Sequence, residues 1–220
     1  MKNYAIVLAS GSSSRFEDEL PKQFAQIDDK TVLEHCILAF ENNPKITDII
    51  VVCNPDYMEL SKKILNGKFQ KITAIINGGK TRQESSFLGI SLVKEDNANV
   101  LIHDGARPFV SQKIIDDCIL ALEKFDAAAV AINSTDTIIK VDENEFISEI
   151  PTRNYLRRIQ TPQAFKANII KQAHNLAKNN PTVIVTDDCG MVVHFNLAKI
   201  KILQGDEANI KITFKKDLNR

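Results

Sequence analysis

The sequence predicts an α/β fold: a mostly parallel β-sheet flanked by helices, with one projecting β-hairpin. Short runs of apolar, largely β-branched residues alternate with amphipathic stretches along most of the chain, as repeated strand–helix–strand units require. After Ile132 this alternation is interrupted by a polar stretch around a turn, which is a hairpin pattern. The length of 220 residues is enough to bury one good core. We therefore expect a single Rossmann-like domain over residues 1–220.

The apolar runs are typical of strands that are buried on both faces. They lie at residues 4–9, 48–53, 71–76, 100–103 and 127–132. The amphipathic stretches between them predict helices at residues 31–41, 57–65, 81–93 and 112–125. In the last third of the chain we expect a helix near 166–178, a strand at 199–203 and another short run at 209–214. Lys215 and Lys216 are typical of a solvated helix start.

Residues 133–150 read as two short alternating runs around Asp142, Glu143 and Asn144, which favour a turn. The predicted arm extends over about residues 133–157. A two-stranded hairpin is only marginally stable by itself, so it needs a surface to pack against. A second copy of the chain is the economical choice, and we expect a homodimer joined through this arm.

Charge and composition exclude several classes of protein. The 28 Lys and Arg residues balance 28 Asp and Glu residues, which argues against a general nucleic-acid binder. No apolar run is long enough to span a bilayer, and the first residues become polar too early for a signal peptide, so we expect a soluble cytoplasmic protein without membrane partners. The cysteines are far apart and lack CxxC spacing, which predicts buried thiols at Cys36, Cys53, Cys118 and Cys189.

The segment after the first strand has the composition of an anion-binding loop. In parallel sheets, ligands bind beyond the carboxyl ends of the strands. There the chain reads Ser10-Gly11-Ser12-Ser13-Ser14-Arg15, followed by Leu20-Pro21-Lys22-Gln23. Small residues let backbone N–H groups face a phosphate, and Arg15 and Lys22 add positive charge. An ordinary solvated turn is the alternative, and neither GxGxxG nor GxxxxGK[ST] is present.

Two further segments follow strands in the same way. Residues 77–85 contain Gly78-Gly79, which permits close approach to a flat ligand, and Ser85 would face the same cleft; an ordinary strand-to-helix turn is the alternative. Residues 103–108 place Asp104 and Arg107 at the mouth of the sheet, where a structural ion pair is the alternative. We expect His103 to pack beneath the site, and no catalytic role is expected for His35 and His174 in helices or His194 near a strand.

Six segments together resemble a known family. HDGARP at 103–108, QTPQ at 160–163 and NIKIT at 209–213 form a highly specific combination, accompanied by residues 9–22, 78–85 and 186–188. They occur in the order found in cytidylyltransferases of the methylerythritol phosphate and ribitol phosphate type. The resemblance covers nearly the whole chain. One departure is that the family's first loop commonly carries more glycine, whereas this chain has serines.

The resemblance implies a role for each segment. The triphosphate of CTP would be held by Ala9, Ser10, Gly11, Ser12, Ser13, Ser14, Arg15 and Lys22. Cytosine would be recognised by Gly79, Lys80 and Ser85, and the ribose and the incoming alcohol would lie beside Asp104 and Arg107. The sugar-alcohol phosphate would contact Asp104, Thr161, Thr186, Asp187 and Lys211, and also Thr137 and Arg153 from the partner subunit's arm.

The implied reaction needs no general base. A phosphate monoester oxygen, already anionic, attacks the α-phosphorus of CTP, and pyrophosphate leaves. Catalysis then depends on alignment and on charge neutralisation by Arg15, Lys22 and Mg²⁺, with Arg153 and Lys211 at the second phosphate. We expect the CTP phosphates to supply most of the magnesium ligands, with Asp104 as the one candidate from the protein.

The resemblance divides at the acceptor. Ile150-Pro151-Thr152-Arg153 followed by Leu156-Arg157-Arg158 looks more like the ribitol phosphate branch of the family, and residues 186–190 lean the same way. The Arg157 and Arg158 pair also suits a polar pentitol, so we expect ribitol 5-phosphate as the acceptor. The alternative is methylerythritol phosphate, which would assign the enzyme to isoprenoid synthesis rather than to polyol-polymer precursors. A non-catalytic nucleotide-binding module is a second class, disfavoured by the charges that a leaving pyrophosphate requires. A dinucleotide-dependent oxidoreductase is disfavoured by the missing glycines.

Overall fold

Strand β1 (Asn3–Ala9) is central to the fold because apolar side chains occupy both of its faces. Each of its residues is buried, as expected of a parallel strand covered on both sides. Ala5 and Val7 pack into one hydrophobic cluster, and Ile6 and Leu8 pack into a second cluster on the opposite face. The computed structural model describes residues 1–220 apart from 14–15, 17–19, 181, 184 and 220.

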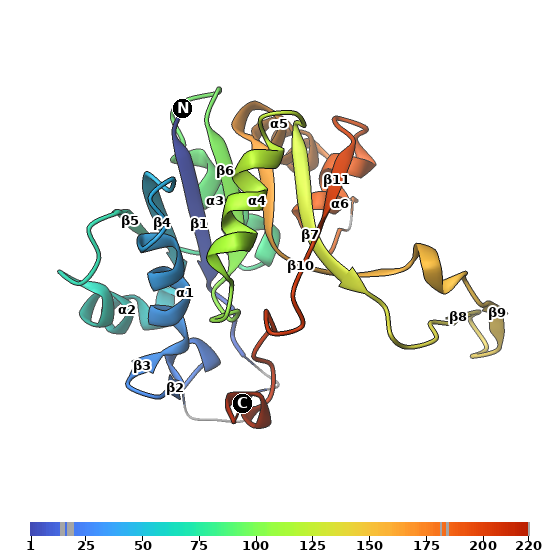
Figure 1. The fold of residues 1–220 in the computed structure, drawn as a ribbon, viewed down its shortest axis with the longest axis horizontal. Coiled ribbons are helices and arrows are strands. Elements are labelled where there is room, and N and C mark those ends of the chain that lie inside the picture. Colours follow the sequence, from blue (N-terminus) through green and yellow to red (C-terminus); the bar gives the residue numbers. More distant parts are fainter. Residues whose placement is uncertain (14–15, 17–19, 181, 184, 220) are drawn as a thin grey trace.

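The main sheet has seven strands in the order β11-β7-β10-β6-β1-β4-β5 (Figure 1). Neighbouring strands are parallel except where β10 runs antiparallel between β6 and β7. The strands after β1 are β4 (Asp48–Cys53), β5 (Ile72–Asn77), β6 (Asn99–Asp104), β7 (Ala127–Asn133), β10 (Arg157–Lys166) and β11 (Ile200–Gln204). A small hairpin of β2 (Gln26–Ile27) and β3 (Lys30–Thr31) leads into the first helix.

Helices cover both faces of this sheet (Figure 1). One face is covered by α1 (Val32–Glu41), α2 (Met58–Leu65) and α4 (Gln112–Ala121). The opposite face is covered by α3 (Arg82–Ser91), α5 (Ala167–Asn179) and α6 (Asp188–His194). Four helices begin at a residue whose side chain accepts a backbone hydrogen bond, namely Thr31, Thr81, Ser111 and Asp187. Short 3₁₀ turns lie at Lys22–Phe24, Pro55–Tyr57, Arg153–Tyr155 and Lys215–Leu218.

These elements confirm the predicted α/β class with a mostly parallel sheet, and they correct several details. Strand β10 was missed because its buried residues include Gln160, Thr161 and Gln163, so its hydropathy is not that of a buried strand. Residues 209–214 form no regular strand; instead the Ile212 N–H donates to the Ala106 carbonyl at 2.8 Å. His194 ends helix α6 rather than lying near a strand. The predicted helices 81–93 and 112–125 end earlier, at Ser91 and Ala121.

The predicted hairpin is present as β8 (Lys140–Val141) paired with β9 (Ile147–Glu149). The Asp142 N–H donates to the Phe146 carbonyl at 2.9 Å and closes the turn. In Figure 1 this arm extends away from the body of the molecule. Its apolar side chains are exposed in the single chain, Phe146 by 71% and Tyr155 by 87%. Such a surface is typical of a contact with another protein chain.

The four cysteines are free and buried, as predicted. Within the described parts of the chain, no helix combines the length and the apolar character needed to cross a membrane.

Candidate functional site

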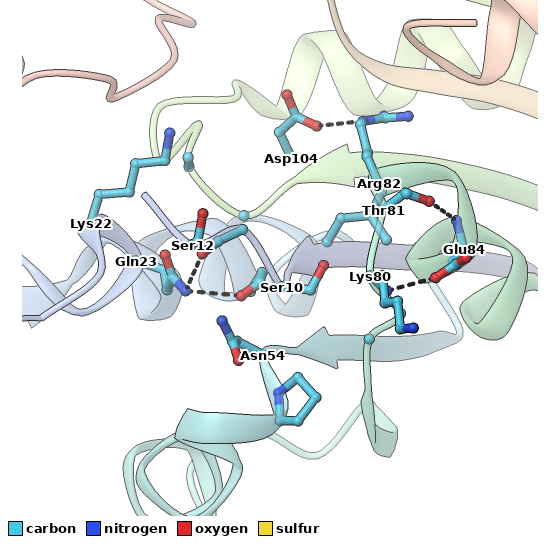
Figure 2. A pocket seen from close by; sticks show the side chains of 18 of the residues that line it. Ser10, Ser12, Lys22, Gln23, Asn54, Lys80, Thr81, Arg82, Glu84 and Asp104 are labelled. Carbon is cyan, nitrogen blue, oxygen red and sulfur yellow. Dashed lines mark hydrogen bonds and ion pairs between the residues drawn. The ribbon is translucent and has the colours of Figure 1, made fainter. Parts of the chain in front are cut away.

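A cavity of about 790 Å³ lies where β1, β4, β5 and β6 end. Its walls are the segments that follow these four strands, at residues 8–12, 54–56, 78–82 and 104–106, together with Lys22, Gln23, Glu84 and Lys211. Parallel strands bring their carboxyl ends to one edge, so the sequence-separated segments meet there. Figure 2 shows Lys22 and Gln23 on one side of this cavity, Arg82 and Glu84 on another, and Asp104 between them.

The loop after β1 is held in shape by Gln23. Its Nε2 donates to the carbonyls of Ala9 at 3.0 Å and Gly11 at 3.3 Å. Its Oε1 accepts from Ser13 Oγ, which in turn accepts from the Lys22 N–H, each at 3.2 Å. Ser13 has a φ of 60°, in the left-handed region that favours glycine. These bonds stabilise the serine loop in a conformation that a glycine would adopt more readily. The predicted ligands Ser14 and Arg15 lie outside the described residues.

The loop after β5 approaches β1 so closely that it requires glycine. A Cβ atom on Gly78 would lie 2.4 Å from the Cβ of Ser10. Ser85 is buried beneath this contact, where its hydroxyl accepts from Ser10 Oγ at 2.7 Å and from the Gly79 N–H at 3.1 Å and donates to the Thr81 carbonyl at 2.9 Å. Its hydrogen-bonding capacity is thus used within the protein. Ser85 shapes the loop from below, whereas Gly79 and Lys80 line the cavity.

Asp104 is the electrostatic centre of the cavity. Its Oδ2 lies 2.8 Å from Lys211 Nζ and 3.9 Å from Arg107 Nε, and its Oδ1 lies 3.4 Å from Arg82 Nε. Burial by itself raises the pKa of this carboxyl, but the attraction of Lys211 and Arg82 outweighs it and holds the pKa well below its usual range. Asp104 is thus surrounded by three positive charges, but the Arg82 guanidinium also pairs with the ionised Asp188 carboxylate, so these five groups together carry a net charge of +1. This local excess favours an anionic ligand although the whole chain is neutral.

His103 and Thr161 support Asp104 from below. The His103 Nε2–H donates to the Arg107 carbonyl at 3.0 Å, which leaves Nδ1 to accept from Thr161 Oγ1 at 3.0 Å. Thr161 Oγ1 also accepts from the Asp104 N–H at 3.1 Å. Burial lowers the pKa of His103 to about 4, so its ring is neutral at pH 7. The structure places His103 beneath the site, as predicted, and it places Thr161 in the same supporting layer.

Arg107 turns towards the C-terminal segment rather than into the cavity. Its Nη1 donates to the Asn209 carbonyl at 2.7 Å, and its side chain is not among those that line the cavity. Together with the Ile212 to Ala106 backbone bond, this contact places Lys211 beside Asp104. A direct contact of Arg107 with ribose stays a prediction.

The other acceptor residues do not line the main cavity. Thr186 and Asp187 border a smaller neighbouring cavity of about 230 Å³, which shares Thr81 and Arg82 with the large one. Asp187 caps α6 through Gly190 N–H at 2.8 Å and also accepts from Gln163 Nε2 at 2.7 Å.

Thr137 and Arg153 lie together on the arm, joined by a 2.8 Å hydrogen bond from Arg153 Nη2 to Thr137 Oγ1. The arm extends away from the body that holds the cavity of its own chain (Figure 1).

Several cavity residues were not singled out by the sequence reasoning. Gln23 and Arg82 lie inside the recognised segments, but their side-chain partners are distant in sequence. Asn54 directly follows β4, and this position could have identified it. Residues that follow a parallel strand are expected to line a ligand site, and the segments after the other central strands are predicted for that reason. Glu84 accepts from the Lys80 N–H at 2.6 Å and closes the Gly79 turn, a role that depends on the fold of that loop.

The described residues contain no group of three His, Cys, Asp or Glu side chains that could hold a metal ion by themselves. Asp104 is a suitable oxygen ligand, but both of its oxygens already face cations. This donor set fits a magnesium ion that takes most of its ligands from nucleotide phosphates and water.

The comparisons with known proteins point to one family. The family model described as 2-C-methyl-D-erythritol 4-phosphate cytidylyltransferase matches residues 4–220. The proteins of that name from Thermobifida fusca and Lachnospira eligens are 37% and 39% identical, over 97% and 98% of this chain and 89% and 96% of theirs. The structure of 4-diphosphocytidyl-2C-methyl-D-erythritol synthase from Anaerococcus prevotii superimposes with a TM-score of 0.88 at 31% identity, covering 99% of this chain and 93% of that one.

The fold, the cavity and these likenesses define a nucleotidyltransferase that uses CTP. The chain belongs to the 2-C-methyl-D-erythritol 4-phosphate cytidylyltransferase family. The non-catalytic module and the oxidoreductase are thereby set aside.

The sequence-based preference for ribitol 5-phosphate is not supported, and the comparisons favour the alternative acceptor. In the structure the two arginines on which that preference relied have partners within the chain. Arg157 donates to the Asn154 carbonyl at 2.9 Å, and Arg158 forms a surface ion pair with Glu207 at 2.8 Å.

We predict that Gln23→Ala lowers kcat/KM for CTP about tenfold to a hundredfold, because the Ala9 and Gly11 carbonyls lose their donor and the loop loses its shape. Steady-state kinetics with CTP varied would measure this. Gln112→Ala is the matched control, since Gln112 also donates to a backbone carbonyl, that of Ala39, but lies on α4 away from the cavity. An unchanged kcat/KM in Gln23→Ala would show that the loop keeps its shape without this side chain.

We predict that the stability of the protein depends on pH through His103. Between about pH 6.5 and pH 4 the unfolded chain binds a proton at this position and the folded chain does not, so the free energy of unfolding falls as the pH falls. His103→Gln, which keeps a donor and an acceptor, should reduce this slope by about 1.4 kcal/mol per pH unit. Urea unfolding at several pH values would measure it, with His194→Gln as the exposed control. Parallel curves for His103→Gln and wild type would refute the prediction.

Proposed function

We propose that this chain transfers the cytidylyl group of CTP to 2-C-methyl-D-erythritol 4-phosphate and releases pyrophosphate. The observation that carries the proposal is the excess of positive charge around Asp104, at a cavity formed by the ends of four parallel strands. Family membership and the names of the relatives support the choice of both substrates. The reaction joins two anions, and such a site reduces their repulsion.

The residues of the cavity act by binding and alignment. The nucleophile is a phosphate oxygen that is already ionised, so no side chain has to remove a proton. In this proposal the loop held by Gln23 binds the triphosphate through backbone N–H groups, with Lys22 and Arg15 as its cations. Lys211, which is paired with Asp104, neutralises the acceptor phosphate. Bringing the two reactants into line in this way supplies much of the rate enhancement.

A magnesium ion held by the nucleotide phosphates would neutralise the charge that develops on the leaving pyrophosphate. Asp104, which lines the cavity, is the side chain that we propose as its protein ligand, and Gly79 with Lys80 would face the cytosine. We also propose that the acceptor contacts the four residues predicted from the sequence: Asp104, Thr161, Thr186 and Asp187.

We also propose a homodimer in which the arm completes the partner's site. The exposed apolar side chains of the arm support a protein partner, and a second copy supplies the same surface by symmetry. Arg153 and Thr137 are bonded to each other on the exposed surface of the arm. In this arrangement they would bind the acceptor phosphate in the other subunit.

Acceptor specificity is the direct test of this proposal. With saturating CTP and Mg²⁺, we expect kcat/KM for 2-C-methyl-D-erythritol 4-phosphate to exceed that for ribitol 5-phosphate by tenfold or more, because a site formed for one acceptor leaves polar groups unpaired with the other. A coupled pyrophosphate-release assay measures both. Lys211→Ala should reduce turnover with either acceptor and shows that the signal comes from this cavity. A ratio in favour of ribitol 5-phosphate would contradict the proposed acceptor.

The shared site predicts complementation between two inactive variants. Lys22→Ala and Arg153→Ala homodimers should each be nearly inactive, whereas mixing them with subunit exchange creates heterodimers that contain one intact site. Statistical exchange should restore about a quarter of the wild-type activity. The control mixture combines Lys22→Ala with Lys211→Ala, two changes in one cavity, and should stay inactive. No recovery despite exchange shown by mass spectrometry would mean that Arg153 does not serve the partner's site.

A further inference from the structure

Arg82 joins two buried carboxylates that come from different parts of the fold. Its Nη1 donates to Asp188 Oδ2 at 2.6 Å, and its Nε lies 3.4 Å from Asp104 Oδ1. Asp104 ends β6, Asp188 begins α6, and Arg82 itself begins α3. Figure 2 shows the Arg82 side chain reaching across to Asp104 at the edge of the cavity. One guanidinium therefore fixes the position of three elements relative to each other.

Asp188 is the fixed end of this bridge. Its side chain is fully buried, and besides Arg82 it accepts hydrogen bonds from Ser86 Oγ at 2.5 Å and from His174 Nε2 at 3.0 Å. Burial by itself raises the pKa of Asp188, but the bond from His174 and the charge of Arg82 outweigh it, so the carboxyl stays ionised. A carboxylate with donors on both oxygens, in the core, cannot turn towards a ligand. It can only hold the guanidinium in place.

Asp104 is the end that faces the cavity. Lys211 and Arg107 both approach its Oδ2, whereas Arg82 is the cation that meets Oδ1. Removing the Oδ1 contact would leave both remaining cations on one side, and the carboxylate would rotate towards them. Arg82 is placed to prevent this, since its side chain lines both the large cavity and the smaller one beside α6.

We propose that Arg82, anchored by Asp188, is a positioning residue that sets the orientation of Asp104 for cytidylyl transfer. This inference rests on the proposed function, because it assigns Arg82 a part in that reaction. The same bridge connects Asp104 to the start of α6. Thr186 and Asp187 lie there and line the smaller cavity together with Arg82. Arg82 acts through Asp104 and not by contact with the reacting phosphorus.

The substitution Arg82→Lys separates positioning from folding. A lysine keeps one positive charge for Asp188, so the melting temperature should stay close to that of the wild type. One ammonium group cannot span both carboxylates, so Asp104 loses its Oδ1 contact. We expect kcat to fall about 10²-fold, because a displacement of about 1 Å in an aligned group has that effect. KM for CTP should change less than about threefold, since the loop after β5, which would face the cytosine, is held independently by Ser85.

A double-mutant cycle with Asp104→Asn tests whether Arg82 acts through Asp104. If it does, Arg82→Lys should have little further effect on kcat in the Asp104→Asn background, so the two effects are strongly non-additive. Arg158→Lys is the matched control, because Arg158 pairs with the exposed Glu207 on the surface, and its effect should be small and additive. A crystal structure of Arg82→Lys should show the Asp104 carboxylate turned towards Lys211, a readout that does not depend on turnover.

The possible outcomes separate the inference from the proposed function. Suppose that the wild type turns over the proposed substrates. Near-normal kcat in Arg82→Lys, or additive effects in the cycle, would then overturn the role of Arg82 and leave the proposed function standing. A wild type without turnover contradicts the proposed function, and the inference falls with it. If Arg82→Lys does not fold, Asp188→Asn replaces it, since the amide keeps the shape of the anchor and removes its charge. This variant should also lower kcat non-additively with Asp104→Asn, and additive behaviour would refute the inference.

Discussion

The buried carboxylate of Asp104, held among three cations, is the interaction on which the rest of the site depends. A carboxylate at this depth is stable only when its charge is matched by partners, because burial removes it from water. Its partners come from separate parts of the chain: Arg82 from α3, Arg107 from the loop after β6, and Lys211 from the C-terminal segment. Removing one of these cations would leave the buried Asp104 carboxylate with less compensating positive charge. The requirement therefore ties helix, loop and C-terminal segment to one point.

Strand β10 connects this point to the arm. It runs antiparallel between β6 and β7, continuing from the arm's base at Arg157 to Lys166. Midway along it, Thr161 bonds to both His103 and the backbone of Asp104. The strand is exposed at residues 157–159 and buried at residues 160–165, and it joins the arm directly to the layer beneath the cavity.

Positive charge is concentrated where the backbone also favours anions. The chain as a whole has no net charge, so long-range attraction of nucleotides is weak, and binding depends on the cavity itself. The Gln23 contacts hold the loop after β1 at the carbonyls of Ala9 and Gly11, and in this loop Ser13 has a φ in the left-handed region. Side-chain hydrogen bonds hold this loop in a conformation that glycine would adopt more readily.

The α/β class, the arm and three of the four strand-end segments of the cavity could be predicted from the sequence, whereas the segment after β4 was not singled out. These follow from local rules: apolar runs mark buried strands, and ligands bind where parallel strands end. The contacts of each side chain could be found only from the tertiary structure, because the hydrogen-bond partners are distant in sequence. Ser85 and Thr161, chosen as ligand contacts, have their hydroxyls bonded within the protein, and Arg157 and Arg158, chosen for the acceptor, bond elsewhere. Local composition cannot show where a side chain points, since its direction is set by packing against elements far along the chain.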